Sequence, residues 1–295
     1  MGEHDLLAAE FESHRSHLRA VAYRMLGSLS EAEDAVQDAW LRLSRSDVEE
    51  IQNLAGWLTT VVARVCLNIL RSRKSHPEQA SGMHMPDPVV SRAETPPTPE
   101  EEALLADSVG LAMLVVLDTL APAERMSFVL HDMFAVPFDD IAPIVDRTPT
   151  ATRQLASRAR RRVHEAAPVP DADQARQREI VDAFYAASRD GDFERLLALL
   201  DPDVVLRSDG GTAVPALSQI LTGAHTVASQ AELYRRFVPW TFPATVNGMP
   251  GVVVAPEGKT MSIMSFTIRG DRVVTIDVLA DPTRIAALGL AEWSV

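Results

Sequence analysis

The sequence predicts a multidomain chain in which two all-α segments precede an α+β domain. Three observations predict this class. Apolar residues recur at helical spacing through most of residues 5–166, a proline-rich stretch without that period interrupts them at residues 76–101, and β-rich runs follow residue 200. A chain of 295 residues is long enough for two or three such domains.

Three helices are predicted in the first all-α segment, residues 1–75. The first two occupy residues 5–45 and are separated at Gly27 and Ser28. Ser30 followed by Glu33 indicates a capping box at the start of the second helix. The third helix covers residues 54–74, and no acidic residue occurs from residue 51 to residue 77. Its basic surface consists of Arg64, Arg71, Arg73 and Lys74.

Residues 119–163 predict a helix, a second helix, a short turn and a basic third helix. Thr148 is expected to cap the basic helix, with Pro149 at its first position. Pro143 is expected to bend the preceding helix or end it early, because proline removes a backbone hydrogen bond. Asp146 is expected in the turn, since aspartate tolerates a left-handed backbone better than most residues.

The basic helix has two distinct faces. One is expected to pack on the preceding helix through Thr152, Leu155, Ala159 and Val163. The opposite face carries Thr150, Arg153, Ser157, Arg160 and Arg161. The chain has a formal net charge of −13, so an acid-free basic helix indicates a polyanion partner; a merely solvated helix is the alternative. The pattern is typical of a helix-turn-helix DNA reader, one that needs a partner protein because the whole chain is acidic.

The C-terminal part, residues 174–295, is predicted to be α+β. Two helices joined by Asp190-Gly191 come first, and β-rich runs follow them. Gly270-Asp271 separates the last two runs and indicates a hairpin turn. Helices followed by a meander of strands predict a curved sheet.

The composition predicts a cytoplasmic protein without a cofactor or a metal. No run approaches the roughly 20 apolar residues that span a bilayer, and the N-terminus lacks the pattern of a secretory signal. Cys66 is the only cysteine, which excludes an internal disulfide and a cysteine-based metal site. Its apolar neighbours predict a small core residue.

Three stretches, in this order and spacing, resemble the two conserved domains of bacterial extracytoplasmic-function (ECF) RNA polymerase sigma factors: YRMLGSLSEAEDAVQDAWLRL, GWLTTVVARVCLNILRSRK and residues 119–163. Two more resemble SnoaL-like domains of the NTF2-like fold: FYAASRDGDFERLLALLDPDVVLRSDGG and NGMPGVVV. The resemblance implies two all-α sigma domains, the second with a helix-turn-helix, followed by an α+β NTF2-like cone. The implied bounds are 1–75 for sigma region 2, 76–101 for a linker, 102–167 for region 4 and 174–295 for a SnoaL-like regulatory domain.

The resemblance also implies roles for individual residues. The segment that docks on the β′ clamp of core RNA polymerase matches Asp34, Gln37, Asp38, Trp40 and Leu41. The candidates for contact with the −10 promoter element are Arg64, Asn68, Arg71 and Arg73. The candidates for reading the −35 element are Thr150, Arg153, Gln154, Ser157, Arg158, Arg160 and Arg161.

Two further motifs belong to the sigma-factor subgroup with this C-terminal extension. Its linker motif, Trp-Leu-Pro-Glu-Pro, is here His84-Met85-Pro86-Asp87-Pro88, and its Asp-Gly-Gly-Gly-Lys-type loop is Asp209-Gly210-Gly211-Thr212. The resemblance implies that the C-terminal domain contacts the sigma domains and modulates their activity. A small ligand of this domain is possible, but no residue points to its identity.

Two other functions remain open from the residues alone. The C-terminal domain could be an enzyme, with Asp209, His225, Asp277 and Tyr234 as acid–base candidates, although no pair is identifiable by spacing. The whole chain could be a polymerase-independent repressor, which would need only the basic helix and would leave the Asp34–Leu41 surface unexplained.

Overall fold

The computed structural model describes residues 3–47, 51–75, 85–93, 110–166 and 173–293. These residues form two compact units. The described part of the first unit comprises residues 3–47, 51–75 and 116–166, and that of the second comprises residues 85–93, 110–115 and 173–293. Residues 85–93 lie within the predicted linker, so this stretch folds with the C-terminal domain.

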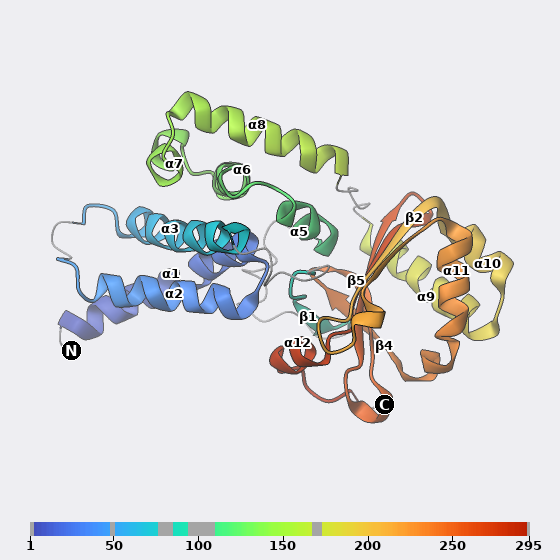
Figure 1. The fold of residues 1–295 in the computed structure, drawn as a ribbon. Helices are drawn as coiled ribbons and strands as arrows, with labels where there is room; N and C mark the ends of the chain where they lie inside the picture. The colour runs from blue at the N-terminus through green and yellow to red at the C-terminus, as the bar shows by residue number, and fades with distance from the viewer. Residues whose placement is uncertain (1–2, 48–50, 76–84, 94–109, 167–172, 294–295) are drawn as a thin grey trace. The chain divides into compact units, whose positions relative to one another are not determined.

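The first unit is helical and begins with three helices that pack on one another (Figure 1). These are α1 (Glu3–Leu26), α2 (Leu29–Leu43) and α3 (Leu54–Ser75). Their core includes Leu18, Val21, Leu58 and Cys66, each with no exposed surface. The prediction that Cys66 is a core residue is confirmed, and burial raises the pKa of its thiol to about 12.

The predicted capping box of α2 is wrong by two residues. Gly27 has a left-handed backbone, φ +69°, which ends α1 and leaves Ser28 as the extended residue before α2. The Ser28 hydroxyl therefore accepts the cap hydrogen bond, from the Glu31 N–H at 3.5 Å. Glu33 instead forms an ion pair with Arg15 of α1.

The second helical segment has the predicted order and an additional π-turn. Its elements are α5 (Leu111–Asp118), α6 (Pro122–Phe128), the π-turn η3 (Val129–Met133), α7 (Phe138–Val145) and α8 (Pro149–Ala166). The Thr148 cap is confirmed, since its Oγ1 accepts from the Ala151 N–H at 3.2 Å. Asp146 is left-handed, φ +58°, as expected. Helix α7 continues for two residues beyond Pro143, which lies on its exposed side.

The second unit is built on a seven-stranded sheet in the order β1-β4-β5-β6-β7-β2-β3. Neighbouring strands are antiparallel except β2 and β7, which are parallel. The strands are β1 (Val90–Arg92), β2 (Leu200–Asp209), β3 (Gln219–Thr222), β4 (Thr241–Val246), β5 (Met249–Val254), β6 (Ser262–Arg269) and β7 (Arg272–Leu279).

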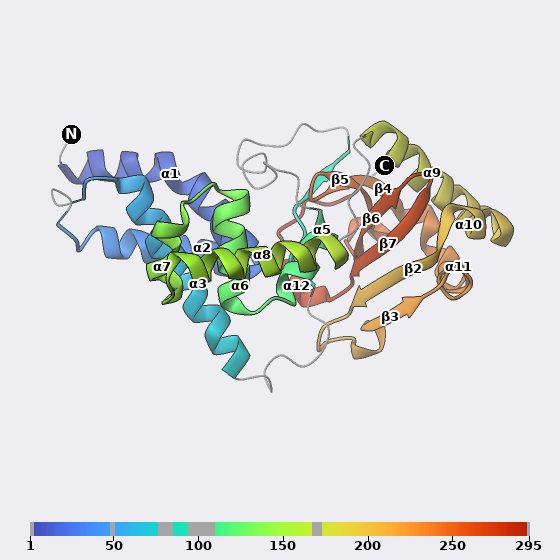
Figure 2. The ribbon, with the colours of Figure 1, turned by 90° about the horizontal axis from the view of Figure 1, so that it is seen from above.

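Three helices pack on this sheet and give the α+β cone (Figure 2). They are α9 (Gln174–Asp190), α10 (Phe193–Leu199) and α11 (Ala224–Leu233). A fourth, α12 (Pro282–Ala287), follows β7. The core between helices and sheet includes Phe184, Leu206, Phe266 and Ile276.

Two hairpins and one unexpected strand shape the sheet. The predicted Gly270-Asp271 turn is confirmed, because Arg269 pairs with Arg272 across it. Residues 245–256 form one β-rich run in the sequence, but in the structure the run includes parts of two strands, β4 and β5, joined at Asn247-Gly248, both with positive φ. The linker supplies β1, which pairs antiparallel with β4 and forms one edge of the sheet.

By length and composition alone, α3 is apolar enough to cross a membrane; it is the one such helix among the described residues. Half of its most apolar window is buried inside the helical unit. A core helix of a soluble protein passes the same test, so this is weak evidence for a membrane span.

Candidate nucleic-acid interface and linker clamp

Helix α8 presents a polar and basic surface on one side and packs on α6 and α7 by the other. The buried residues are Thr152, Ala156, Ala159 and Val163. Leu155, expected on this face, is only partly buried, because Ala156 takes the position nearest the core. All seven candidates for −35 contact are exposed.

Three arginines in the C-terminal half of α8 are paired with carboxylates from α6 and η3, whereas Arg161 pairs with Glu165 of α8 itself. Arg158 Nε lies 3.1 Å from Glu124, and Arg160 Nε lies 2.7 Å from Asp132. Both guanidinium side chains stay 53% exposed. Their carboxylate partners are less exposed, Glu124 by 14% and Asp132 by 20%, but the half-exposed arginines remain accessible to a DNA phosphate.

The N-terminal half of α8 carries shorter polar groups and one arginine. Thr150, Gln154 and Ser157 are exposed there. The Arg153 guanidinium lies over the Phe138 ring of α7, 5.2 Å from its centroid. This contact orients Arg153 without neutralising it, as base readout at the start of a recognition helix requires.

On α3, three of the four candidates for −10 contact share one exposed stripe. Arg64, Asn68 and Arg71 follow at intervals of four and three residues, and all three are exposed. Arg73 is different, because it forms an ion pair with Glu31 and donates to the Leu26 carbonyl at 3.1 Å. In this structure Arg73 therefore fastens the end of α3 to the connection between α1 and α2.

The two helical segments of the first unit also contact one another. Arg125 of α6 is 1% exposed, and its Nε and Nη2 donate to the Arg24 carbonyl of α1 at 3.3 and 3.2 Å. Burial lowers the pKa of Arg125, and the nearby carboxylate of Asp118 opposes this. At the surface, Arg71 Nη2 lies 3.3 Å from the carboxylate of Asp146, the turn residue of the helix-turn-helix.

The proposed polymerase-docking residues of α2 form a mixed surface. Asp34, Gln37 and Leu41 are exposed, Leu41 by 42%. Asp38 accepts from Arg42 at 2.8 Å, and the Trp40 ring packs on Phe11 with 5.1 Å between centroids. Acidic groups beside exposed apolar surface suit a protein partner better than DNA.

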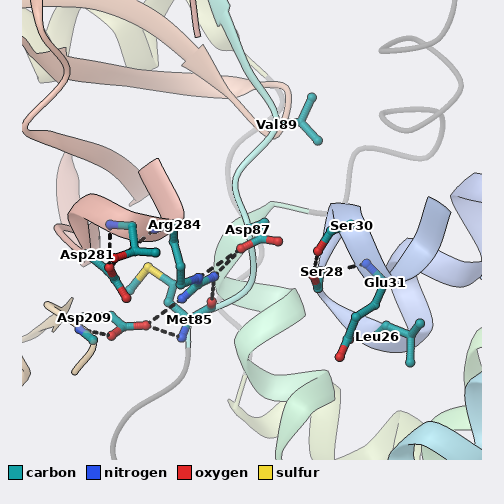
Figure 3. Close-up of polar contacts among 12 residues, drawn as sticks. Leu26, Ser28, Ser30, Glu31, Met85, Asp87, Val89, Asp209, Asp281 and Arg284 are labelled. Carbon is teal, nitrogen blue, oxygen red and sulfur yellow. Dashed lines mark hydrogen bonds and ion pairs between the residues drawn. The ribbon is translucent and has the colours of Figure 1, made fainter. Parts of the chain in front are cut away.

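Asp209 is the centre of a polar cluster that holds the linker on the second unit. Its Oδ2 accepts from the Met85 N–H at 2.9 Å and from Arg284 Nη1 at 2.8 Å. Arg284 also donates to the Met85 carbonyl, and its Nε donates to Asp87 at 3.1 Å (Figure 3). Asp281 caps the N-terminus of α12, the helix that carries Arg284. We call Asp87, Asp209 and Arg284 the linker clamp.

The two loop glycines allow this arrangement. Gly211 has φ +59°, and a Cβ there would lie 1.8 Å from the Asp281 carboxylate. A Cβ on Gly210 would lie 2.2 Å from the Val214 carbonyl oxygen. The Gly211 N–H donates to Asp209 Oδ1 at 2.9 Å, which orients the carboxylate toward the linker. Side chains at either position would displace the clamp.

The linker is held at further points along its described length. The Val89 N–H donates to Asn247 Oδ1 at 3.1 Å, and the Asn247 N–H donates back to the Val89 carbonyl at 2.8 Å. Arg92 lies over the Trp293 ring, 4.9 Å from its centroid, and donates to the Glu292 carbonyl at 2.7 Å.

Of the predicted linker motif, Pro86 and Pro88 are buried and Asp87 is half-buried, while His84 lies outside the described residues. Sequence reasoning identified Asp87 and Asp209 but missed Arg284 and Asn247. The Asn-Gly pair at 247–248 was the available signal for a turn; Arg284 carries no local signal.

The acid–base candidates of the enzyme hypothesis do not converge. The second unit holds a cavity of about 660 Å³, and Tyr234 lines it, whereas Asp209, Asp277 and His225 do not. Asp277 pairs instead with Arg207 at 2.7 Å. Burial raises the pKa of Asp277, and Arg207 opposes this. Among the described residues, the lining contains no carboxylate or imidazole, so these candidates form no acid–base pair within the cavity.

Along the chain, a three-helix domain is followed by a helix-turn-helix and then by an α+β cone that holds the connecting linker. This combination defines a multidomain transcription factor. Comparison with known proteins makes the class specific. Residues 11–76 match the family model Sigma-70 region 2, and residues 111–163 match Sigma-70, region 4.

Relatives that match nearly the whole chain come from Mycobacterium tuberculosis. The probable ECF RNA polymerase sigma factor SigI of strain H37Rv is 33% identical, with 98% of each chain covered. ECF RNA polymerase sigma factor SigJ is 36% identical over 96% of this chain and 95% of its own. The crystal structure of SigJ superposes with a TM-score of 0.78 over 94% of this chain and 97% of that one.

The chain therefore belongs to the ECF family of RNA polymerase sigma factors, with a C-terminal NTF2-like extension. It acts in transcription initiation with core RNA polymerase and promoter DNA, as this class does. The family assignment replaces the hypothesis of a polymerase-independent repressor.

Proposed function

We propose that this sigma factor divides promoter recognition between three surfaces and regulates it through the linker clamp. Helix α2 docks on the β′ clamp of core polymerase through Asp34, Gln37, Asp38, Trp40 and Leu41. Helix α3 contacts the −10 element through Arg64, Asn68 and Arg71, and α8 reads the −35 element. The exposure of these side chains, apart from the partly buried Asp38 and Trp40, and the half-exposed arginines of α8 support the proposal.

Arg73, the fourth candidate for −10 contact, has a different part in the proposal. It holds the C-terminal end of α3 against α1 and α2 through its bonds to Glu31 and the Leu26 carbonyl. It reaches DNA only after those bonds exchange.

Regulation by the C-terminal domain is the second part of the proposal, and the linker clamp is the observation that carries it. The linker joins the two promoter-reading domains, so the distance they can span depends on how much of it is free. Residues 85–92 are fixed by Asp209, Arg284, Asn247 and the pairing of β1 with β4. Because a clamped linker is effectively shorter, the C-terminal domain restrains transcription until the clamp opens.

In vitro transcription tests the first part. Core RNA polymerase is supplied with fragmented genomic DNA, with and without the full-length protein, and the 5′ ends of the transcripts are sequenced. New start sites that share a −35 and a −10 element support the proposal. Demonstrated binding to core without new starts would show that the protein is held inactive, and absence of binding would contradict the docking role of α2.

A further inference from the structure

The cavity of about 660 Å³ in the second unit has the properties of a small-molecule site. Its volume lies within the range of roughly 300–1,000 Å³ found for ligand pockets. The walls are mostly apolar, with Leu206, Val227, Met264, Ile276 and Val278 among the lining residues. A few polar groups are placed among them, including Ser208, Gln219, Gln230 and the hydroxyl of Tyr185.

The charged side chains among the described lining residues of the cavity are all cations. Arg236 and Lys259 are the cations that line it, and both are exposed, as expected at the mouth of a cavity. Arg236 lies over the Phe237 ring, 4.7 Å from its centroid, and Phe237 also lines the cavity. Since the described lining contains no carboxylate, an apolar molecule with one acidic group matches both the walls and the rim.

The walls of the cavity and the linker clamp are built on the same backbone segments. On β2, Leu206 and Ser208 line the cavity, while the next residue, Asp209, holds the linker on the opposite face. After β7, Ala280 and Pro282 line the cavity, and Asp281 between them caps the helix that carries Arg284.

Strand pairing joins the two segments. Ser208 is opposite Val278 and Asp209 is opposite Leu279 in the parallel β2–β7 pair, and the Ala280 N–H donates to the Asp209 carbonyl at 2.7 Å. A shift of the cavity wall therefore moves the backbone of Asp209. Because packed cores switch between discrete arrangements, this pairing is a route by which occupancy of the cavity can reach the clamp.

We propose that this cavity binds an apolar small molecule with one acidic group, such as a medium-chain fatty acid, and that binding stabilises the clamped linker. The contacts that a ligand adds are made with walls in their clamp-closed position, so the closed state binds more tightly. Coupling of this kind is reciprocal, and opening the clamp must weaken ligand binding by the same factor. The regulatory meaning rests on the proposed function, whereas the binding does not.

The test uses the full-length protein without polymerase, so that its failure is separate from failure of the proposed function. Dodecanoate and, as a neutral control, dodecanol are titrated by calorimetry. Saturable binding of dodecanoate at one site is expected, with slower amide hydrogen exchange at Met85 and Val89 in the bound state. No saturable binding would overturn the site, and binding without slower exchange would overturn the coupling.

Two substitutions assign the binding to this cavity. Arg236→Glu is exposed and is expected to weaken dodecanoate binding about tenfold while leaving dodecanol binding unchanged, since it reverses one charge at the rim. Arg269→Glu makes the same change at an exposed position outside the lining and is expected to have no effect. Ala231→Trp, which fills the cavity from α11, is expected to abolish binding of both compounds. Equal dodecanoate affinity in wild type, Arg236→Glu and Ala231→Trp would overturn the proposal.

Discussion

Helix α8 of the helical unit and the linker clamp of the sheet unit use arginine in opposite ways. On α8 of the helical unit, Arg158 and Arg160 remain 53% exposed while paired. In the sheet unit, Arg284 is 18% exposed and its partner Asp209 is 3% exposed. An exposed pair contributes little and exchanges its partner readily, whereas breaking a buried pair leaves an uncompensated charge. Helix α8 thus keeps Arg158 and Arg160 accessible, whereas the linker clamp uses Arg284 to fix structure.

The largest effect is expected from breaking the clamp. Arg284→Ala leaves Asp209 and Asp87 without their cation, so it should lower the unfolding free energy of the sheet unit by about 3 kcal/mol. Chemical denaturation monitored by hydrogen exchange in β2 and α12 measures this. Arg176→Ala is the matched control, because Arg176 is half exposed and pairs with exposed Glu179 and Asp271. Equal, small losses in both variants would contradict the comparison between units.

The next effect concerns DNA sequence readout. Arg153→Ala should weaken holoenzyme binding to a promoter by about 1–3 kcal/mol, and the loss should depend on the −35 sequence. Arg161→Ala, whose side chain is 70% exposed at the outer side of α8, should reduce binding equally on every sequence. Competition binding with −35 variants separates the two. A uniform loss for Arg153→Ala would make it a phosphate contact.

A smaller effect is expected where the two basic helices meet. Asp146→Asn removes the carboxylate that pairs with Arg71, and asparagine keeps the left-handed turn. Promoter affinity of the holoenzyme should rise by at most about 1 kcal/mol, because the pair is exposed. Asp140→Asn removes the same charge from α7 at an exposed position. If it raises affinity equally, overall charge and not release of Arg71 explains the effect.

The smallest expected effect is a pH dependence of the helical unit. The His17 ring lies edge-on to Phe134, with centroids 5.3 Å apart, and its pKa is lowered by desolvation of the ring and by neighbouring His14 and Arg24, although the residue as a whole is exposed. The unfolded state therefore binds the proton more tightly. The contribution of His17 to the unfolding free energy should be fully present above the ordinary histidine pKa and should decrease as pH falls below it. His17→Gln should make the urea midpoint of this unit depend less on pH between pH 5 and about pH 7. An unchanged pH dependence would contradict the assignment.

Local patterns made much of this fold predictable. The helices, the Thr148 cap and the left-handed Asp146 depend on residues a few positions apart, and sequence reasoning found them. The capping box of α2 was misplaced, because Gly27 determines where the extended residue falls and Ser30 offered an equally good pattern.

Interactions between distant residues were not predictable in the same way. Strand β1 pairs with β4 across more than 150 positions of the chain, and three residues without β periodicity give no signal for it. Asp209 was identified from its motif, but its partner Arg284 lies 75 positions away on a short helix. The cavity is likewise assembled from many elements, so the sequence pattern does not distinguish its apolar lining residues from ordinary core residues.

The most direct test of regulation by the linker clamp is transcription from one promoter with core polymerase and either wild-type protein or Arg284→Ala. Arg176→Ala serves as the control, and all three proteins are first shown to be folded and to bind core equally. The account predicts severalfold more transcript with Arg284→Ala and no change with Arg176→Ala. Unchanged or reduced output with Arg284→Ala would contradict restraint of the linker by the C-terminal domain.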